Sequence, residues 1–355
     1  MSFLNDNICK EVRRIINSSK IFYRDPKEKD NYSLICAVLN RIDDSVDFLN
    51  SNDDKLSKDN DIILFIVHSC MVVDAVKIMM KNLNMNPDDY DEVNYFKSVC
   101  MSDALIVKET ECIKDSKFFE YFRSLVFAHP VDTSRAKFLK KQNEIHYSPF
   151  LLSEHNSMRK NSIGIMIYSS KTPDVKLLYV PHNAIFNYIN SKYELLNLIK
   201  KELENRIEVK NKEWSMCKIN RNQSPLHVLY EVSNILKDRY ENTYEIEELI
   251  NLLEYKSSNL KNEAAVKKIK DTINLLVPKI CDSIESFDYE KYSKILDEIF
   301  CKPKNMHENA NYELEKIRCN LNIETPQINQ DFGLSCAKSF YEQFANKWVY
   351  NLKRK

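Results

Sequence analysis

The sequence predicts a mainly α-helical protein that contains one small β-hairpin. Three observations lead to this fold class. The 355 residues include only two glycines, Gly164 and Gly333, and glycine is the residue that adopts the positive φ angles of tight hairpins at low cost. Most of the chain repeats apolar residues at helical spacing. One short region instead has two β-rich segments on either side of a turn.

Helical periodicity dominates the chain as far as residue 130. The predicted helices cover residues 5–20, 32–50, 61–83 and, as a weaker pattern, 91–100. The third of these is apolar nearly all round, which is typical of the central helix of a bundle. The pattern over 102–113 is ambiguous. Asp115 and Ser116 are expected to cap the next helix, which ends near Ala128 because Pro130 disfavours helical backbone at the residue before it.

The pattern changes in the middle of the chain. Residues 145–152 have no helical period. The β-rich segments 163–168 and 175–180 flank a turn at 170–174 that contains a proline. Two such segments around a turn predict a hairpin that interrupts an otherwise helical protein.

Helical spacing returns after the hairpin and continues to the C-terminus. A long helix is expected over residues 184–214. Ser224 and Pro225 then form a start signal, an N-cap residue followed by proline at the first helical position. Further helices are expected over 226–240, 245–255, 260–276, 289–300 and 334–352.

The predicted organisation therefore has three parts. A helical bundle covers residues 1–141, an irregular segment with the hairpin covers 142–182, and a helical region covers 183–355. A further break between Trp214 and Gln223 would divide the last part. A chain of this length can form two domains, or one large helical domain with an appendage.

Composition excludes several functional classes. Two glycines are too few for a dinucleotide fingerprint, and their positions fit neither a Walker A loop nor a hydrolase nucleophile elbow. The 52 basic residues balance 52 acidic ones, so any contact with RNA should be local. The ten cysteines include no C-x-x-C pair and are expected to be reduced thiols.

The chain is expected to be a cytoplasmic protein without a membrane segment. Asp6 introduces an acidic residue too early for a signal peptide. The longest apolar run, Ile62–Val73, is too short to span a bilayer and is interrupted by His68 and Ser69.

The chemistry-bearing segment is the helix end that carries Arg123 and His129. Arginine is a permanent cation that can hold a phosphate through two donors, and histidine transfers protons near neutral pH. Together they could cut RNA without a metal, by promoting attack of a 2′-hydroxyl on the adjacent phosphorus. One copy supplies one histidine, so separate base and acid would need two copies. This favours a homodimer with both segments facing one cleft.

These residues resemble the R-x(4–6)-H motif of the HEPN superfamily ribonucleases, which occur in bacterial toxins, abortive-infection proteins and type VI CRISPR effectors. The resemblance covers roughly residues 1 to 140 and implies an HEPN-like bundle. It implies that Arg123 binds phosphate and that His129 transfers protons, with Glu120 and Ser124 as supporting residues. It also implies RNA as substrate and, as partners, a second copy and an antitoxin or other defence-system protein.

Another interpretation of the chain remains open. Arg123 could simply pair with Glu120 or a helix C-terminal carbonyl while His129 caps the helix end. The protein would then be a non-catalytic dimerisation, nucleotide-sensing or partner-binding protein. Neutral charge and the long C-terminal half favour this alternative.

Basic and aromatic residues after the motif suggest where RNA could bind. They could follow a single-stranded backbone and stack bases, although an ordinary basic loop fits the pattern equally well. The basic residues are Lys137, Lys140, Lys141, Arg159 and Lys160, interleaved with Phe138, Tyr147 and Phe150.

No metal or cofactor is expected. His146, Glu154 and His155 follow the basic segment, but their spacing fits no standard zinc pattern. These two histidines are predicted to be exposed loop residues.

Overall fold

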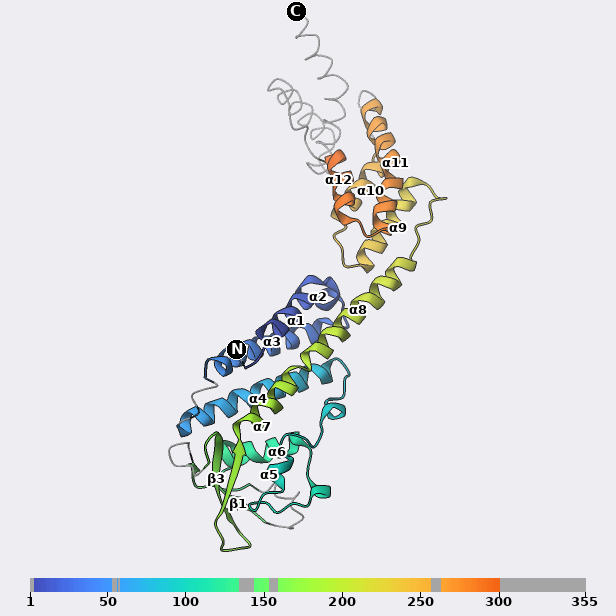
Figure 1. The fold of residues 1–355 in the computed structure, drawn as a ribbon. Helices are drawn as coiled ribbons and strands as arrows, with labels where there is room; N and C mark the ends of the chain where they lie inside the picture. Colours follow the sequence, from blue (N-terminus) through green and yellow to red (C-terminus); the bar gives the residue numbers. More distant parts are fainter. Residues whose placement is uncertain are drawn as a thin grey trace, which may run out of the picture. The chain divides into compact units, whose positions relative to one another are not determined.

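The computed structural model describes residues 3–52, 56, 58–133, 144–152, 159–256 and 263–300. The chain forms two compact units, Met1–Ile207 and Glu208–Lys355. The described residues are mainly helical and include a small antiparallel sheet, which confirms the predicted fold class at this level (Figure 1).

The first unit begins with three helices that pack along one another. α1 (Asp6–Ser18), α3 (Lys29–Asn52) and α4 (Asp59–Asn82) correspond to the first three predicted helices, and α2 (Lys20–Arg24) is an additional short one. The predicted helix over 91–100 is helical only at its end. The elements that follow α4 are η1 (Pro87–Tyr90), α5 (Lys97–Cys100), η2 (Glu109–Glu111), α6 (Asp115–Arg123) and η3 (Ser124–Ala128).

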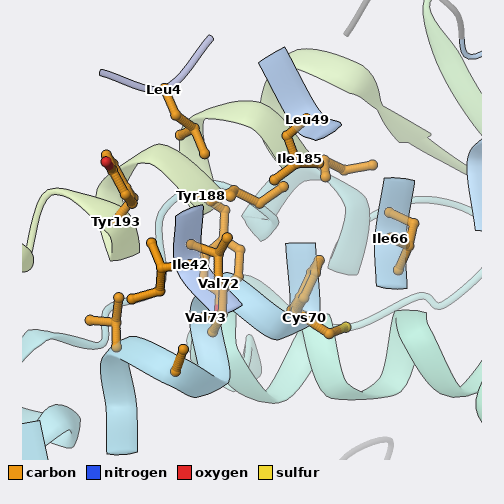
Figure 2. Packing of buried hydrophobic residues seen from close by; sticks show 14 of the residues in the cluster. Leu4, Ile42, Leu49, Ile66, Cys70, Val72, Val73, Ile185, Tyr188 and Tyr193 are labelled. Carbon is orange, nitrogen blue, oxygen red and sulfur yellow. The ribbon is translucent and has the colours of Figure 1, made fainter. Parts of the chain in front are cut away.

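Helix α4 is the centre of the first unit's core. Its buried residues include Ile66, Val72 and Val73, which lie among side chains from the N-terminal segment and from α3 and α7 (Figure 2). The structure extends the helix well beyond the apolar run Ile62–Val73. By length and composition α4 could cross a membrane, but 56% of its most apolar stretch is buried inside the protein. That burial is typical of a core helix in a soluble protein.

The predicted hairpin is confirmed. β3 (Ser162–Ser169) and β4 (Lys176–Pro181) pair antiparallel with Ile165 opposite Leu178. Two short strands, β1 (His146–Tyr147) and β2 (Leu151–Leu152), also pair antiparallel with β3.

One predicted helix is two in the structure. α7 (His182–Tyr193) and α8 (Leu196–Met216) are separated at Glu194 and Leu195. The sheet, α7 and the first part of α8 share one hydrophobic core with α1, α3 and α4. The first compact unit therefore includes the hairpin and ends at Ile207, within α8.

The second unit has its own hydrophobic core. Ser224 accepts a hydrogen bond from the backbone N–H of His227, which confirms the predicted start signal. The helices are α9 (Pro225–Asp238), α10 (Tyr244–Glu254), α11 (Glu263–Glu285) and α12 (Tyr289–Phe300). The predicted helix over 334–352 lies outside the described residues.

The shortage of glycine is visible at helix C-termini. Tyr240 follows α9 with φ 59° and Phe287 follows α11 with φ 59°, positions that glycine usually occupies. The buried Arg239 guanidinium donates to the carbonyl of Ile284 at 2.6 Å and lies 4.1 Å from the Phe287 ring. The contact of the Arg239 guanidinium with the ring and its hydrogen bond near the end of α11 offset the strain of the left-handed backbone at this corner.

Candidate functional site

The start of α6 is fixed by contacts with the loop before it. Asp115 was expected to cap α6, but its carboxylate instead accepts the backbone N–H groups of Asn94, Tyr95 and Phe96, each at 3.0 Å. The helix has no side-chain N-cap bond, because its cap position is Lys114. The cap prediction is therefore wrong: the acidic group instead accepts the N–H groups of the preceding loop, including that of the buried Phe96.

Helix α6 ends in a single π-helical turn that separates Arg123 from His129. The turn covers Ser124–Ala128, and the N–H of His129 donates to the carbonyl of Ser124 at 2.9 Å. His129 then leaves helical geometry, with φ −145° and ψ 53°. The predicted end at Ala128 is confirmed. Single π turns within helices occur frequently at functional sites.

Arg123 lies across from the central helix α4. Its Nη1 is 3.5 Å from the Asp74 carboxylate, and its side chain is 31% exposed. Burial raises the pKa of the Cys70 thiol to about 11, and the nearby Arg123 charge opposes that rise. Glu120 pairs with Lys117 at 3.3 Å. Asp74, and not the predicted Glu120, is thus the carboxylate paired with Arg123.

Ser124 is buried and its hydroxyl is engaged within the helix. Its Oγ donates to the carbonyl of Glu120 at 2.8 Å. A hydroxyl that bonds the carbonyl four residues earlier often bends a helix. Ser124 therefore supports the transition from α6 to the π turn and does not face a substrate in this arrangement.

His129 is exposed, and its backbone holds the following loop. Its carbonyl accepts the N–H of Asp132 at 3.1 Å and the hydroxyl of Thr133 at 2.7 Å. Within the described part of the chain, no hydrogen bond or ion pair engages the imidazole or joins it to Arg123. The two side chains therefore lie at one end of α6 without direct bonding.

A buried polar network joins α6 to the strand β1 and the residues just before it. The Tyr121 hydroxyl is 2.7 Å from Nδ1 of His146, and His146 Nε2 is 3.3 Å from Glu144. Glu144 also accepts from the Ser169 hydroxyl at 2.5 Å. Burial raises the pKa of the Tyr121 phenol, so it stays protonated. The prediction that His146 is exposed is wrong, because β1 turns it toward the core side of the sheet.

We expect replacement of His146 by phenylalanine to destabilise the first unit. The change removes one partner from each of two buried groups, Tyr121 and Glu144, at a cost of about 1–3 kcal/mol. Chemical denaturation monitored by circular dichroism would measure it. Replacing the exposed His227 in the same way serves as the control, and an equal loss in both variants would contradict the structural role of the network.

The predicted RNA-binding residues are only partly described. Lys137, Lys140 and Lys141 lie outside the described residues, as does His155. Arg159 and Lys160 are exposed, and the Arg159 guanidinium lies 5.1 Å from the centre of the Tyr179 ring. Among the described residues no group of three or more His, Cys, Asp or Glu side chains is placed to hold a metal ion.

Sequence reasoning missed Asp74 and the Tyr121–His146 pair. A single carboxylate within the apolar stretch of α4 was the available signal for Asp74. No local signal identified the pair, because Tyr121 and His146 belong to different elements. No protein-family model, curated protein or solved structure matches this chain.

Proposed function

We propose that this protein is a metal-independent endoribonuclease that cleaves RNA by 2′-hydroxyl attack. The observation that carries the proposal is the π turn with a partly exposed Arg123 before it and an exposed His129 after it. In this proposal Arg123 binds the scissile phosphate and stabilises its developing charge, while His129 transfers a proton. The resemblance to HEPN ribonucleases supports the same roles and suggests a toxin or phage-defence effector.

The ion pair with Asp74 is compatible with phosphate binding. The pair is long, at 3.5 Å, and both side chains reach solvent. Such pairs contribute about 0–1 kcal/mol. Arg123 can therefore exchange Asp74 for a phosphate, with which a guanidinium forms two parallel hydrogen bonds.

A homodimer would supply separate base and acid, and α4 offers a face for it. Leu64, Met71 and Ile78 are exposed and spaced seven residues apart, so they form one stripe along the helix. A two-fold axis through Met71 would place Leu64 opposite Ile78 and Asp61 opposite Lys81 of the second copy. This pairing matches apolar with apolar and acid with base. Asp74 lies one turn from Met71 and is the ion-pair partner of Arg123. The Arg123 side chains of both copies would therefore approach the two-fold axis.

We expect Met71→Lys to dissociate the dimer, because it places two like charges on the proposed axis. Sedimentation equilibrium should show the wild type as a dimer and the variant as a monomer, and RNA cleavage should fall with dissociation. Met101→Lys, which changes an exposed methionine outside the stripe, is the matched control. A monomeric wild type, or an unaffected variant, would exclude this face.

The alternative is a non-catalytic partner-binding protein. The observation that favours it is the same α4 stripe, which could hold a different protein, together with the pairing of Arg123 to Asp74. Under this alternative Arg123 would have a structural role only. The purified protein would then bind a partner through α4 and leave RNA intact.

The direct test is to incubate the purified protein with total RNA in the presence of EDTA and to map the cut ends. The proposal predicts undiminished cleavage and 2′,3′-cyclic phosphate ends, because the attacking group is the substrate's own hydroxyl. Cleavage that depends strictly on Mg²⁺, or 5′-phosphate products, would place the chemistry elsewhere.

A further inference from the structure

The small sheet has one buried face and one face turned away from the core. On β3, Ile163, Ile165 and Ile167 are buried in the core of the first unit. Successive side chains of a strand point to opposite faces, so the residues between them belong to the outer face. Gly164 is one such position, and Tyr168, the residue after Ile167, lies on the same face.

Cross-strand pairs make this outer face continuous. Tyr168 lies opposite Tyr147 of β1. Toward the other end of β3, Gly164 lies opposite Tyr179 of β4. Between them, the N–H of Met166 donates to the carbonyl of Phe150 at 3.2 Å, which brings the Phe150 segment alongside. We call the surface formed by Tyr147, Phe150, Tyr168 and Tyr179 the aromatic face.

Three of the four rings of the aromatic face are exposed to a ligand, and Tyr179 is half-buried. Tyr147 is 36% exposed, Tyr168 is 38% exposed and Phe150 is 63% exposed. Exposed aromatic side chains that cluster on one sheet are unusual in a protein that buries most of its large apolar groups. A planar ligand that stacks on rings would remove them from water.

The segments that form the sheet carry more basic than acidic side chains, which favours an anionic ligand. The Arg159 guanidinium lies over the Tyr179 ring. Of the two acidic residues in the described parts of 144–182, Glu144 is buried in the polar network, which leaves Asp174 exposed. The basic residues of the same parts are Arg159, Lys160, Lys171 and Lys176.

The aromatic face begins next to the segment that carries His129. The N–H of Ser148 donates to the carbonyl of Pro130 at 2.5 Å, and Thr133 forms a bridge with His146. Tyr147 is therefore held between two residues that are bonded to the loop after His129.

We propose that the aromatic face binds single-stranded RNA, with bases stacked on Tyr147, Tyr168 and Phe150 and the backbone held by Arg159 and Lys160. The inference rests on the proposed ribonuclease function and specifies its substrate class. Stacking on an aromatic ring requires an unpaired base with a free face, and every base offers one. The site therefore selects unpaired RNA with little preference for sequence.

The test measures binding of a short fluorescein-labelled poly(A) RNA by fluorescence anisotropy, with His129→Ala as the background so that the RNA stays intact. Tyr147→Ala and Tyr168→Ala should each weaken the affinity by about five- to a hundredfold. Tyr147→Phe and Tyr168→Phe keep the rings and should restore binding, which separates stacking from misfolding. Tyr230→Ala, which removes an exposed tyrosine of the second unit, is the control. The same labelled RNA paired with a complementary poly(U) strand should bind more weakly than the single strand.

The other possible results would each overturn either this inference or the ribonuclease proposal. Unchanged affinity in both alanine variants would overturn the proposal. So would loss of self-association in those variants at constant RNA affinity, because a second copy would then be the occupant. If the wild type cleaves RNA through His129 but the tyrosines do not affect binding, only this inference fails. If the wild type does not cleave but binding depends on the rings, the ribonuclease proposal fails and the aromatic face remains an RNA site.

Discussion

Replacing His129 with alanine is expected to reduce RNA cleavage by about 10²–10⁴-fold, which is the usual contribution of one general acid or base. The side chain is exposed and lies at the end of the π turn, where its removal breaks none of the described hydrogen bonds. The variant should therefore keep the fold and the RNA affinity of the wild type. Single-turnover cleavage of a labelled RNA, with circular dichroism as the fold check, would measure the effect.

His227→Ala is the matched control, because it removes an exposed histidine from the second unit. It should leave cleavage unchanged. Arg123→Lys keeps the charge but loses the planar donor pair that grips a phosphate, so it should also cleave poorly. Equal rates for the wild type and the His129 variant would rule out the imidazole as the proton-transfer group and favour the non-catalytic alternative.

Replacing Lys192 with methionine is expected to lower the free energy of unfolding by about 3–5 kcal/mol, because it leaves a buried carboxylate without its cation. Lys192 Nζ lies 2.8 Å from the carbonyl of Tyr90 and 3.2 Å from the Asp91 carboxylate. Asp91 also accepts the N–H and the hydroxyl of Ser116, which ties α7 to the start of α6. Urea denaturation at neutral pH would measure the loss.

The same pair predicts how stability depends on pH. Burial raises the pKa of Asp91, but the hydrogen bond from Ser116 and the charge of Lys192 outweigh burial and leave the pKa below its ordinary value. A depressed carboxyl pKa adds stability that is present above the unfolded value of about 3.9 and is lost as pH falls through the folded value. In Lys192→Met the pKa of Asp91 should rise toward or above its unfolded value, so the loss of stability on acidification should be smaller than in the wild type.

Lys200→Met provides the control for both measurements. Its ion pair with Glu11 has an N–O distance of 2.6 Å, but both side chains are partly exposed to solvent, so its loss should cost about 0–1 kcal/mol. A similar loss in the two lysine variants would show that burial does not govern the strength of the Lys192 pair.

Features with a local cause were predictable from the sequence. Pro130 ends the helix before His129, Ser224 caps the helix that begins at Pro225, and alternating apolar residues form the hairpin. In each case the determining residues lie within a few positions of the feature. The mainly helical fold follows from many such local patterns taken together.

Residue type and spacing identified Arg123 and His129 as candidates. The residues that surround them in the fold could not be predicted in this way. Asp74 is 49 residues from Arg123, and His146 is 25 residues from Tyr121. The break between α7 and α8 and the shared core of hairpin and bundle also depend on packing between distant segments. A local pattern contains no information about such contacts.

The sequence alone thus determined the helices, the hairpin and the two side chains at the end of α6, because neighbouring residues decide backbone conformation and chemical type. Only the tertiary structure decided that Arg123 meets Asp74, that His146 is buried and that aromatic rings gather on one side of the sheet. Those arrangements arise when segments far apart in the chain pack to bury apolar surface, and each polar group then takes the partner that packing brings near.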